Sequence, residues 1–205
     1  MNARRIRALA ASTATLLCCG AAEATTTGVP RTNVHTIIVH AVSGPSCLLG
    51  RIVYSGAPGN AQRWKRFFDN HPFLGIHYVV DRDGVVLAST PEDRTANHAL
   101  GNNDGTIGIE LVHAGDGVEP FGDKQIDALI TLIKSIRTRH KIPIENIKSH
   151  AEVDKRTFTC AGQTIKSRLD PGANFPWAKL RAALKNSTSS PSTPEPARSE
   201  PARRD

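Results

Sequence analysis

The chain has 205 residues, a length that suits one domain with a sizeable hydrophobic core and additional tails. Its formal net charge is +7 at pH 7, but the basic residues are scattered, and only two Trp and two Tyr are available to stack on bases. Composition therefore argues against nucleic-acid binding. The basic excess suits contact with anionic polymers or lipid headgroups, or it serves solubility alone.

Residues 1–24 have the pattern of a secretory signal peptide. Three arginines among the first seven residues precede a weakly apolar stretch that ends at Cys19, and Ala22-Glu23-Ala24 supplies the small residues expected before a cleavage site. The apolar stretch is too short, and too interrupted by Ser and Thr, to form a spanning helix. We therefore expect an exported protein, either periplasmic or secreted.

Lipidation of Cys19 is an alternative to simple cleavage, because Cys18-Cys19-Gly20 has the features of a lipid-attachment site. Cys19 would then be the first residue of the mature protein. Membrane association is expected only by this route, since no other segment of the sequence is long and apolar enough to cross a bilayer.

Patterned sequence begins after residues 25–33, which we expect to form an exposed leader. The β-branched apolar run at residues 34–40 predicts a buried strand. Residues 41–59 are rich in Gly, Pro and Ser and predict a loop, and residues 60–70 predict a helix with its aromatic side chains on one side. Residues 76–87 predict a β-hairpin, because an Asp-Gly pair lies between two apolar runs.

The second half of the chain alternates in the same way. Residues 106–113 predict a strand, and residues 122–140 predict the clearest helix, with apolar residues three or four positions apart. Residues 147–150 predict a short strand and residues 177–184 a last helix. From residue 186 the chain is rich in Ser, Thr, Pro, Glu and Arg and has too little apolar surface to fold, so residues 186–205 are expected to be a disordered tail.

Strands that alternate with helices over residues 34–185 predict an α/β fold, with a single layered domain and a central mixed β-sheet flanked by helices. Two cysteines, Cys47 and Cys160, remain after removal of the signal peptide. In an oxidising compartment such a pair is expected to form a disulfide, which would close a long loop and stabilise the fold. The alternative is two buried thiols.

Three side chains that could bind a metal stand at the ends of predicted elements. His40 ends the first strand, His150 ends another short strand, and Asp170 precedes a Pro-Gly turn. Two His and one Asp are a ligand set for catalytic zinc that leaves the fourth position to water. Glu110 lies inside an apolar strand, where a carboxylate is costly to bury unless it is paired or functional, so it is a candidate general acid or base.

Structural roles remain open for the same residues. The spacing is not diagnostic by itself, because the sequence has no HExxH helix. Glu110 could be a partly exposed carboxylate of a surface strand, and Asp170 could cap the helix that follows it. Asp154 could accept a hydrogen bond from His150 or form a salt bridge with Lys155 or Arg156.

Five short stretches of the sequence are each weak evidence of a family resemblance when taken alone, but their occurrence together in this order is specific. They are residues 37–40, residues 77–84, residues 97–99 with 105–111, residues 149–154, and residues 170–172 with 175–177. In this order they resemble the zinc amidases of the N-acetylmuramoyl-L-alanine amidase type 2 family, which are relatives of the peptidoglycan recognition proteins. The resemblance extends over residues 34–182, nearly all of the chain expected to be ordered.

The resemblance implies an activity and a site. By position, His40, His150 and Asp170 match the family's zinc ligands, and Glu110 matches the strand glutamate that acts as catalytic acid or base. It thus implies a monomeric zinc hydrolase whose catalytic domain, residues 34–185, cleaves the amide bond between N-acetylmuramic acid and L-alanine in peptidoglycan or muropeptides. The alternative is a peptidoglycan-binding protein that keeps the fold without catalysis.

Two further positions carry roles implied by the resemblance. Arg168 stands where the family usually has a Lys that stabilises the oxyanion, and Arg keeps the charge. His98 matches a His that lines the site without binding zinc, where it would contact the sugar or its lactyl group.

The sequence also departs from the family pattern. Asn97 replaces the Trp that commonly precedes the His-Ala pair, and Ala41 replaces a second His after His40. Asp170 follows His150 by twenty positions, about twice the spacing in compact members of the family. Cys160 lies in this longer segment and is the alternative third ligand, although relatives that use Cys have it at the position of Asp170.

Overall fold

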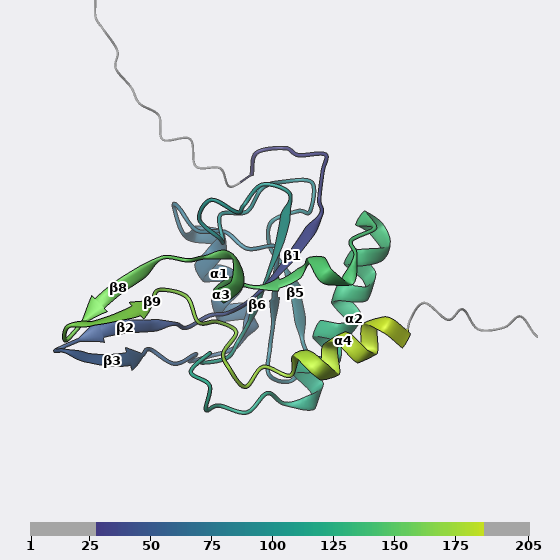
Figure 1. Ribbon diagram of the computed structural model, residues 1–205. Helices are drawn as coiled ribbons and strands as arrows, with labels where there is room; N and C mark the ends of the chain where they lie inside the picture. The colour runs from purple at the N-terminus through teal and green to yellow at the C-terminus, as the bar shows by residue number, and fades with distance from the viewer. Residues whose placement is uncertain (1–27, 187–205) are drawn as a thin grey trace, which may run out of the picture.

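The central feature of the fold is a five-stranded sheet in the order β5-β4-β6-β1-β7. The structure is a computed structural model, and it describes residues 28–186 (Figure 1). The strands of the sheet are β1 (Thr36–Ala41), β4 (Tyr78–Val80), β5 (Val86–Ala88), β6 (Thr106–Leu111) and β7 (Ile147–Ser149). Only β5 runs antiparallel to its neighbour, whereas the other pairs are parallel. The predicted α/β class with a mixed sheet is therefore confirmed.

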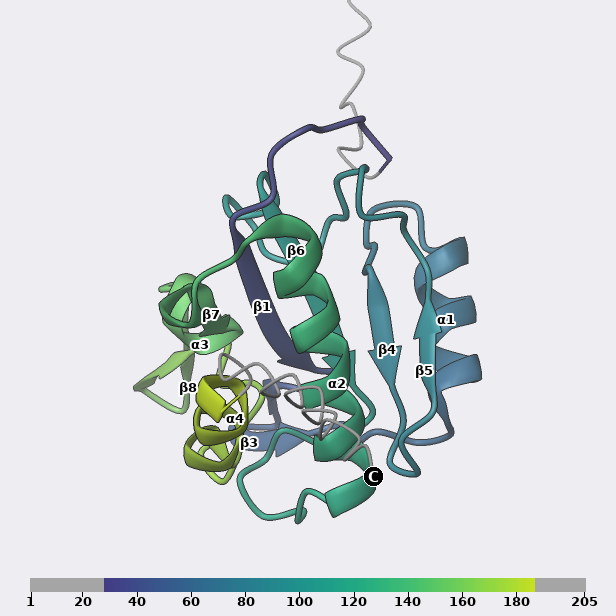
Figure 2. The ribbon, with the colours of Figure 1, turned by 90° about the vertical axis from the view of Figure 1, so that its right-hand side faces the viewer.

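Helices cover both faces of this sheet. The helix α1 (Ala61–Asn70) packs on one face, and α2 (Asp123–His140) and α4 (Trp177–Lys185) pack on the other. Figure 1 shows the sheet nearly edge-on between these layers, and Figure 2 shows it with α2 in front. Most core side chains, among them those of the apolar stripe predicted for α2, lie on the α2 side.

Alternation along the strands decides which side chains face α1. Ile37 and Val39 pack on the α2 side, so Ile38 and His40 point to the α1 side, since successive side chains of a strand point to opposite faces. In β6 the same alternation directs Glu110 to the α1 side. The face with the smaller apolar cluster is therefore the one that receives the polar candidates.

Gly108 of β6 is needed for the close packing of that face. A Cβ atom at this position would lie 2.6 Å from Cγ of His98 and 2.7 Å from Cδ1 of Ile76. We expect Gly108→Ala to lower the free energy of unfolding by about 1–3 kcal/mol, as overpacking of a buried site does. Urea unfolding measures this loss. Gly44→Ala is the control, because its Cβ would meet nothing within 4 Å; equal stabilities of the two variants would contradict the prediction.

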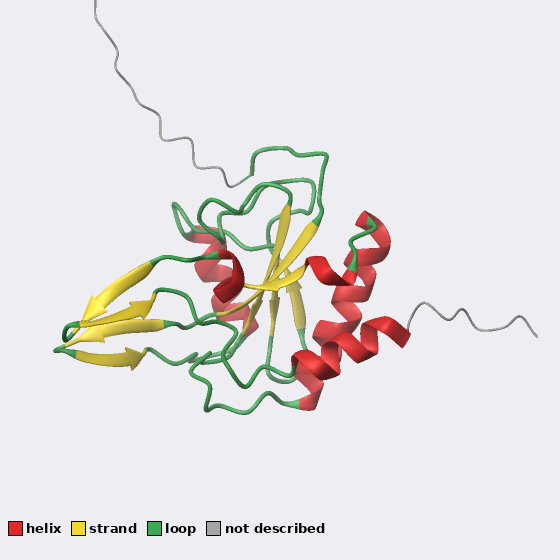
Figure 3. Cartoon of the chain, viewed as in Figure 1, coloured by secondary structure: helices red, strands yellow, loops and turns green. Residues whose placement is uncertain are grey.

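Two β-hairpins project from the sheet and lie side by side (Figures 1 and 3). We call them the hairpin arm. It consists of β2 (Pro45–Leu48) with β3 (Arg51–Tyr54) and β8 (Thr157–Cys160) with β9 (Gln163–Lys166). The first hairpin corrects the prediction of a loop at residues 41–59. The composition of this segment is that of a turn, and the second hairpin, against which it lies, is more than a hundred positions away in the sequence. The local sequence pattern therefore did not reveal the first hairpin.

The expected disulfide between Cys47 and Cys160 is present in the structure, and it joins the two hairpins of the arm. The remaining short elements are the 3₁₀ turn η1 (Ile144–Asn146) and the helix α3 (His150–Val153). The strand predicted through residue 150 ends at Ser149, which caps α3 by accepting a hydrogen bond from the backbone N–H of Glu152.

The ends of the chain are only partly described. The signal peptide expected at residues 1–24 lies outside the described residues, as does the expected tail beyond Asn186. Within the expected leader, Pro30 forms a β-bridge with Arg94, and the Arg31 guanidinium donates to the Thr106 carbonyl at 2.5 Å. No helix in residues 28–186 is both long enough and apolar enough to cross a membrane.

Candidate metal and catalytic site

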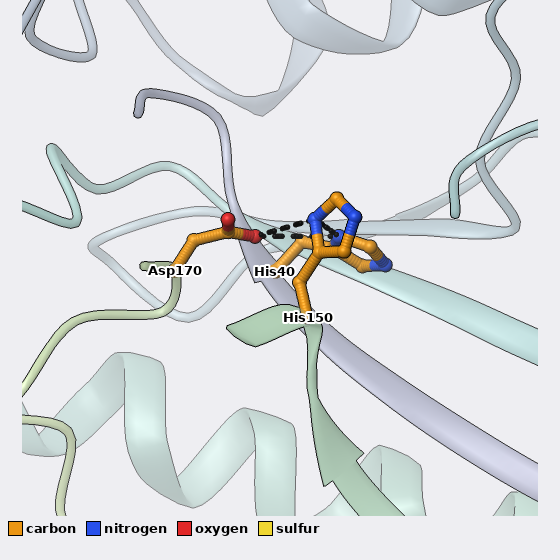
Figure 4. A group of neighbouring side chains, drawn as sticks. All are labelled: His40, His150 and Asp170. Carbon is orange, nitrogen blue, oxygen red and sulfur yellow. Dashed lines mark hydrogen bonds and ion pairs between the residues drawn. The ribbon is translucent and has the colours of Figure 1, made fainter. Parts of the chain in front are cut away.

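Three candidate ligands that are far apart in the sequence meet at one end of the sheet (Figure 4). His40 comes from β1 and His150 from the junction of β7 and α3, and the pairing of β1 with β7 sets these two elements side by side. Asp170 comes from the segment after the arm, and its backbone carbonyl accepts from the N–H of Ala151 at 3.2 Å. All three side chains are buried.

The donor atoms of these residues fit a metal ion. Nδ1 of His40 lies 2.9 Å from Nδ1 of His150 and 3.4 Å from Oδ2 of Asp170, and Nδ1 of His150 lies 3.0 Å from the same Oδ2. Tetrahedral ligands on zinc bonds of about 2.0–2.1 Å are about 3.3 Å apart. Two imidazole nitrogens and a carboxylate oxygen also form a donor set typical of zinc.

The protonation states suit metal binding. Burial lowers the pKa of His40 to about 4, although the Asp170 carboxylate acts in the opposite direction, so the imidazole is neutral at pH 7. Burial acts to raise the pKa of Asp170, but hydrogen bonds with His150 and His40 outweigh it, and the net shift is well downward. A neutral imidazole and a charged carboxylate are the forms that coordinate a cation.

Glu110 faces the same end of the sheet from β6, where it pairs with His40 across the parallel ladder. Its carboxylate is buried, and Oε2 has no hydrogen-bond partner among residues 28–186. Burial raises the pKa of Glu110 well above its usual range, the negative charge of Asp170 adds to this, and Arg168 opposes it. A carboxyl group with a raised pKa and a free oxygen is suited to accept and return a proton near neutral pH.

A cleft of about 260 Å³ opens over these groups, and Glu110, His150, Asp170, His98 and Arg168 line it. The sequence did not assign the rest of the cleft lining to the site. That lining includes three aromatic side chains of α1, Trp64, Phe67 and Phe68, together with Ser43, Gly44, Leu74 and Asn97. The aromatic side of α1 was visible in the sequence, but aromatic side chains on one side of a helix more often signal core packing than a binding wall.

His98 lies against His40 and not among the ligands. Its Nδ1 is 2.9 Å from Nε2 of His40, and its Nε2 is 3.1 Å from Oγ1 of Thr106. Both ring nitrogens of His98 thus have partners, and the residue also lines the cleft. A histidine that bonds the outer nitrogen of a ligand histidine sets the orientation of that ligand.

The two alternatives for the third ligand, Cys160 and Asp170, lie in different parts of the structure. Cys160 is bonded to Cys47 in the hairpin arm, whereas Asp170 lies beside both histidines. Asp170 does not cap a helix either, because the N-cap of α4 is Pro176. Among the described residues, the group of His40, His150 and Asp170 is the one cluster of His, Cys, Asp or Glu side chains that could hold a metal.

Comparison with known proteins relates most of this architecture to one group. A family model described as N-acetylmuramoyl-L-alanine amidase matches residues 30–173. The chain is 28% identical over 141 residues to the 1,6-anhydro-N-acetylmuramyl-L-alanine amidase AmpD of Enterobacter cloacae. This alignment covers 61% of this chain and 69% of that protein. It is 39% identical over 85 residues to the N-acetylmuramoyl-L-alanine amidase AmiD of Escherichia coli K12, but this covers only 38% of the chain and 27% of that protein.

Solved structures share the fold. A selenomethionine derivative of AmpD superposes with a TM-score of 0.55 at 23% identity, over 78% of this chain and 95% of that one. AmiD from E. coli, in complex with anhydro-N-acetylmuramic acid-L-Ala-D-gamma-Glu-L-Lys, superposes with a TM-score of 0.56 at 23% identity, over 73% of this chain and 57% of that one. The endolysin amidase LysCS from Clostridium intestinale superposes with a TM-score of 0.57 at 21% identity, over 78% of this chain and 90% of that one.

Proposed function

This chain belongs to the N-acetylmuramoyl-L-alanine amidase family, and on that premise we propose that it is a zinc-dependent hydrolase of the amide bond between N-acetylmuramic acid and L-alanine in peptidoglycan. The observation that carries the proposal is the convergence of His40, His150 and Asp170 beneath a cleft that Glu110 also faces. The family supplies the reaction, and these four side chains are the parts that the reaction requires.

His40, His150 and Asp170 would hold the zinc ion, through the two Nδ1 atoms and Oδ2. A zinc ion bound there supplies Lewis-acid chemistry, since it polarises a carbonyl oxygen and makes a water molecule more acidic. Glu110 then takes a proton from the attacking water on its free Oε2 and delivers it to the departing L-alanine nitrogen. The raised pKa of Glu110 favours the second transfer, because the carboxyl group holds the proton until the amine leaves.

Arg168 lines the cleft and brings a positive charge to it. We propose that its guanidinium stabilises the oxyanion, the role of a Lys in most of the family. His98 would contact the sugar or lactyl group with its ring, since both of its nitrogens are engaged.

Arg168→Met is expected to lower kcat by about 10²- to 10³-fold, because a preorganised positive charge is lost from the transition state. Arg168→Lys keeps a cation and is expected to retain most of the activity. Steady-state hydrolysis of a muropeptide gives both values. Equal activity of the Met variant and the wild type would remove Arg168 from the mechanism.

The proposed activity is tested by digesting purified cell wall and identifying the products by mass. We expect free stem peptides that begin with L-alanine, one zinc ion per chain, and loss of product release when a chelator removes the metal. Re-addition of zinc should restore it. A protein that binds cell wall without releasing peptides would instead be the non-catalytic binding protein of the same fold.

Export is part of the proposal, and its support is the pattern of residues 1–24. We propose a monomer that acts in the periplasm or outside the cell on peptidoglycan or its muropeptides. The mass of the mature N-terminus distinguishes cleavage after residue 24 from lipidation at Cys19, and only lipidation would associate the protein with a membrane.

A further inference from the structure

The two ligand histidines differ in what bonds their outer nitrogens. Nε2 of His40 has a partner in His98, at 2.9 Å. Nε2 of His150 is buried and has no hydrogen-bond partner in the described part of the chain. A histidine that binds a metal through Nδ1 carries its proton on Nε2, and that buried N–H needs an acceptor.

The carboxylate of Asp154 lies close to this nitrogen. Its Oδ2 lies 3.7 Å from Nε2 of His150, and both side chains are buried. Asp154 is four residues after His150, and its backbone N–H donates to the His150 carbonyl at 2.9 Å, so α3 holds the two side chains on the same face. This distance is longer than a hydrogen bond, so a small shift of the His150 ring toward the carboxylate is needed to form one.

Arg156 binds the other side of this carboxylate. Its Nε lies 3.0 Å from Oδ1 and 3.1 Å from Oδ2 of Asp154, and its Nη2 also donates to Oδ2. The backbone N–H of Arg156 donates to Oδ1 at 2.9 Å. The Nε–H is shared between the two oxygens, so these contacts come from three donors. An ionised carboxylate accepts about four hydrogen bonds, so Asp154 can still accept one more.

A surface salt bridge alone does not account for this arrangement. The Asp154 side chain is 2% exposed, whereas the Arg156 side chain is 49% exposed. Ion pairs with a half-exposed partner contribute little to stability, while burial of a carboxylate is costly. The carboxylate is thus buried toward His150, where an N–H donor lacks an acceptor.

We propose that Asp154 is a positioning residue of the metal site, which accepts the Nε2 proton of His150 and so presents the Nδ1 lone pair to the metal, with Arg156 holding the carboxylate in place. This inference rests on the proposed metal site and adds an outer partner to it. Arg156 directly precedes β8, so the same contact ties the metal site to the root of the disulfide-linked arm.

The test compares zinc affinity among variants, by competition with a chromophoric chelator. Asp154→Ala is expected to weaken zinc binding by about 10- to 100-fold, the usual effect of losing such an outer partner. Asp154→Asn keeps an acceptor oxygen and should fall between this variant and the wild type. Asp127→Ala is the matched control, because it removes only an exposed ion pair with Lys179, and its zinc affinity should equal that of the wild type.

Arg156→Gln separates positioning from folding. It removes the same ion pair but leaves the acceptor, so its thermal stability should fall as in Asp154→Ala while its zinc affinity falls less. Unchanged zinc affinity in Asp154→Ala, or equal losses of affinity in Asp154→Ala and Arg156→Gln, would overturn the proposal.

A second measurement uses the protein without metal and is independent of the proposed reaction. Nitrogen NMR shifts of the imidazole report which ring nitrogen carries the proton. Without metal, Asp170 at 3.0 Å from Nδ1 and Asp154 compete for the imidazole proton of His150. We expect a larger share of the Nε2–H tautomer in the wild type than in Asp154→Ala. The same tautomer populations in both proteins would refute the role of Asp154. This readout does not depend on zinc binding, whereas a wild type that binds no zinc would refute the proposed function.

Discussion

Glu110→Gln is expected to lower kcat by about 10²- to 10⁴-fold, the usual contribution of a general acid–base group. The substitution keeps the size and shape of the side chain but removes the group that accepts and returns the proton. The ligand set of His40, His150 and Asp170 is untouched, so the zinc content should stay the same. Release of stem peptides and metal analysis on the same sample measure the two effects.

The same variant should not be less stable than the wild type. In the metal-free protein the pKa of Glu110 is raised, so the folded state binds its proton more tightly than the unfolded chain does. Stability is then lost as the pH rises from the unfolded pKa toward the folded one, and a neutral amide avoids this loss. Equal or higher thermal stability at pH 7 is the expected result.

Glu145→Gln is the control, since Glu145 lies exposed in η1. It should change neither turnover nor zinc content. Near-normal hydrolysis by Glu110→Gln would remove this residue from the mechanism, and loss of zinc together with activity would mean that Glu110 supports the metal and not the proton transfer.

Loss of the Cys47–Cys160 disulfide is expected to lower the free energy of unfolding by about 4 kcal/mol, since the bond closes a loop with a sequence separation of 113 residues. A loss of this size should lower Tm by roughly 10 °C for a domain of this length. The hairpins are short and carry few buried apolar side chains, so little else holds them together. Thermal unfolding of the Cys47→Ser, Cys160→Ser double variant measures the effect.

The double variant also provides the control for reduction. A reductant should lower the Tm of the wild type toward that of the double variant and leave the double variant unchanged. The first hairpin begins directly after Gly44, and the second ends shortly before Arg168, and both of these residues line the cleft. We therefore expect the double variant to bind substrate more weakly than the wild type. An oxidised wild type and a double variant with the same Tm would show that the bond has no part in stability.

Several parts of this architecture were predictable from local patterns. The β-branched runs of β1 and β6 and the apolar stripe of α2 are periodic signals that burial imposes on any sequence of this fold class. The arm gave no such signal. The strands of its first hairpin are half-exposed and lie in a segment of turn residues, and a disulfide to a distant hairpin holds them.

The candidate site divides in the same way. His40, His150 and Glu110 were singled out as candidates because each is a chemically distinctive side chain in or at the end of an apolar strand, and Asp170 because it precedes a Pro-Gly turn. The wall of the cleft formed by α1 was not recognised. An aromatic side chain has the same sequence signature whether it packs in a core or lines a pocket, and only the neighbouring elements decide between the two.

By itself, the sequence determined which segments become strands and helices and which residue types are available for hydrolysis, because both depend on local periodicity and on the chemistry of single side chains. The tertiary structure alone decided that imidazoles 110 positions apart meet at 2.9 Å, and that Asp170 rather than Cys160 joins them. Parallel pairing of β1 with β6 and β7 is a non-local event, and it brings these groups to one end of the sheet. For Asp154, the fold shows the salt bridge with Arg156 and also places the carboxylate 3.7 Å from Nε2 of His150.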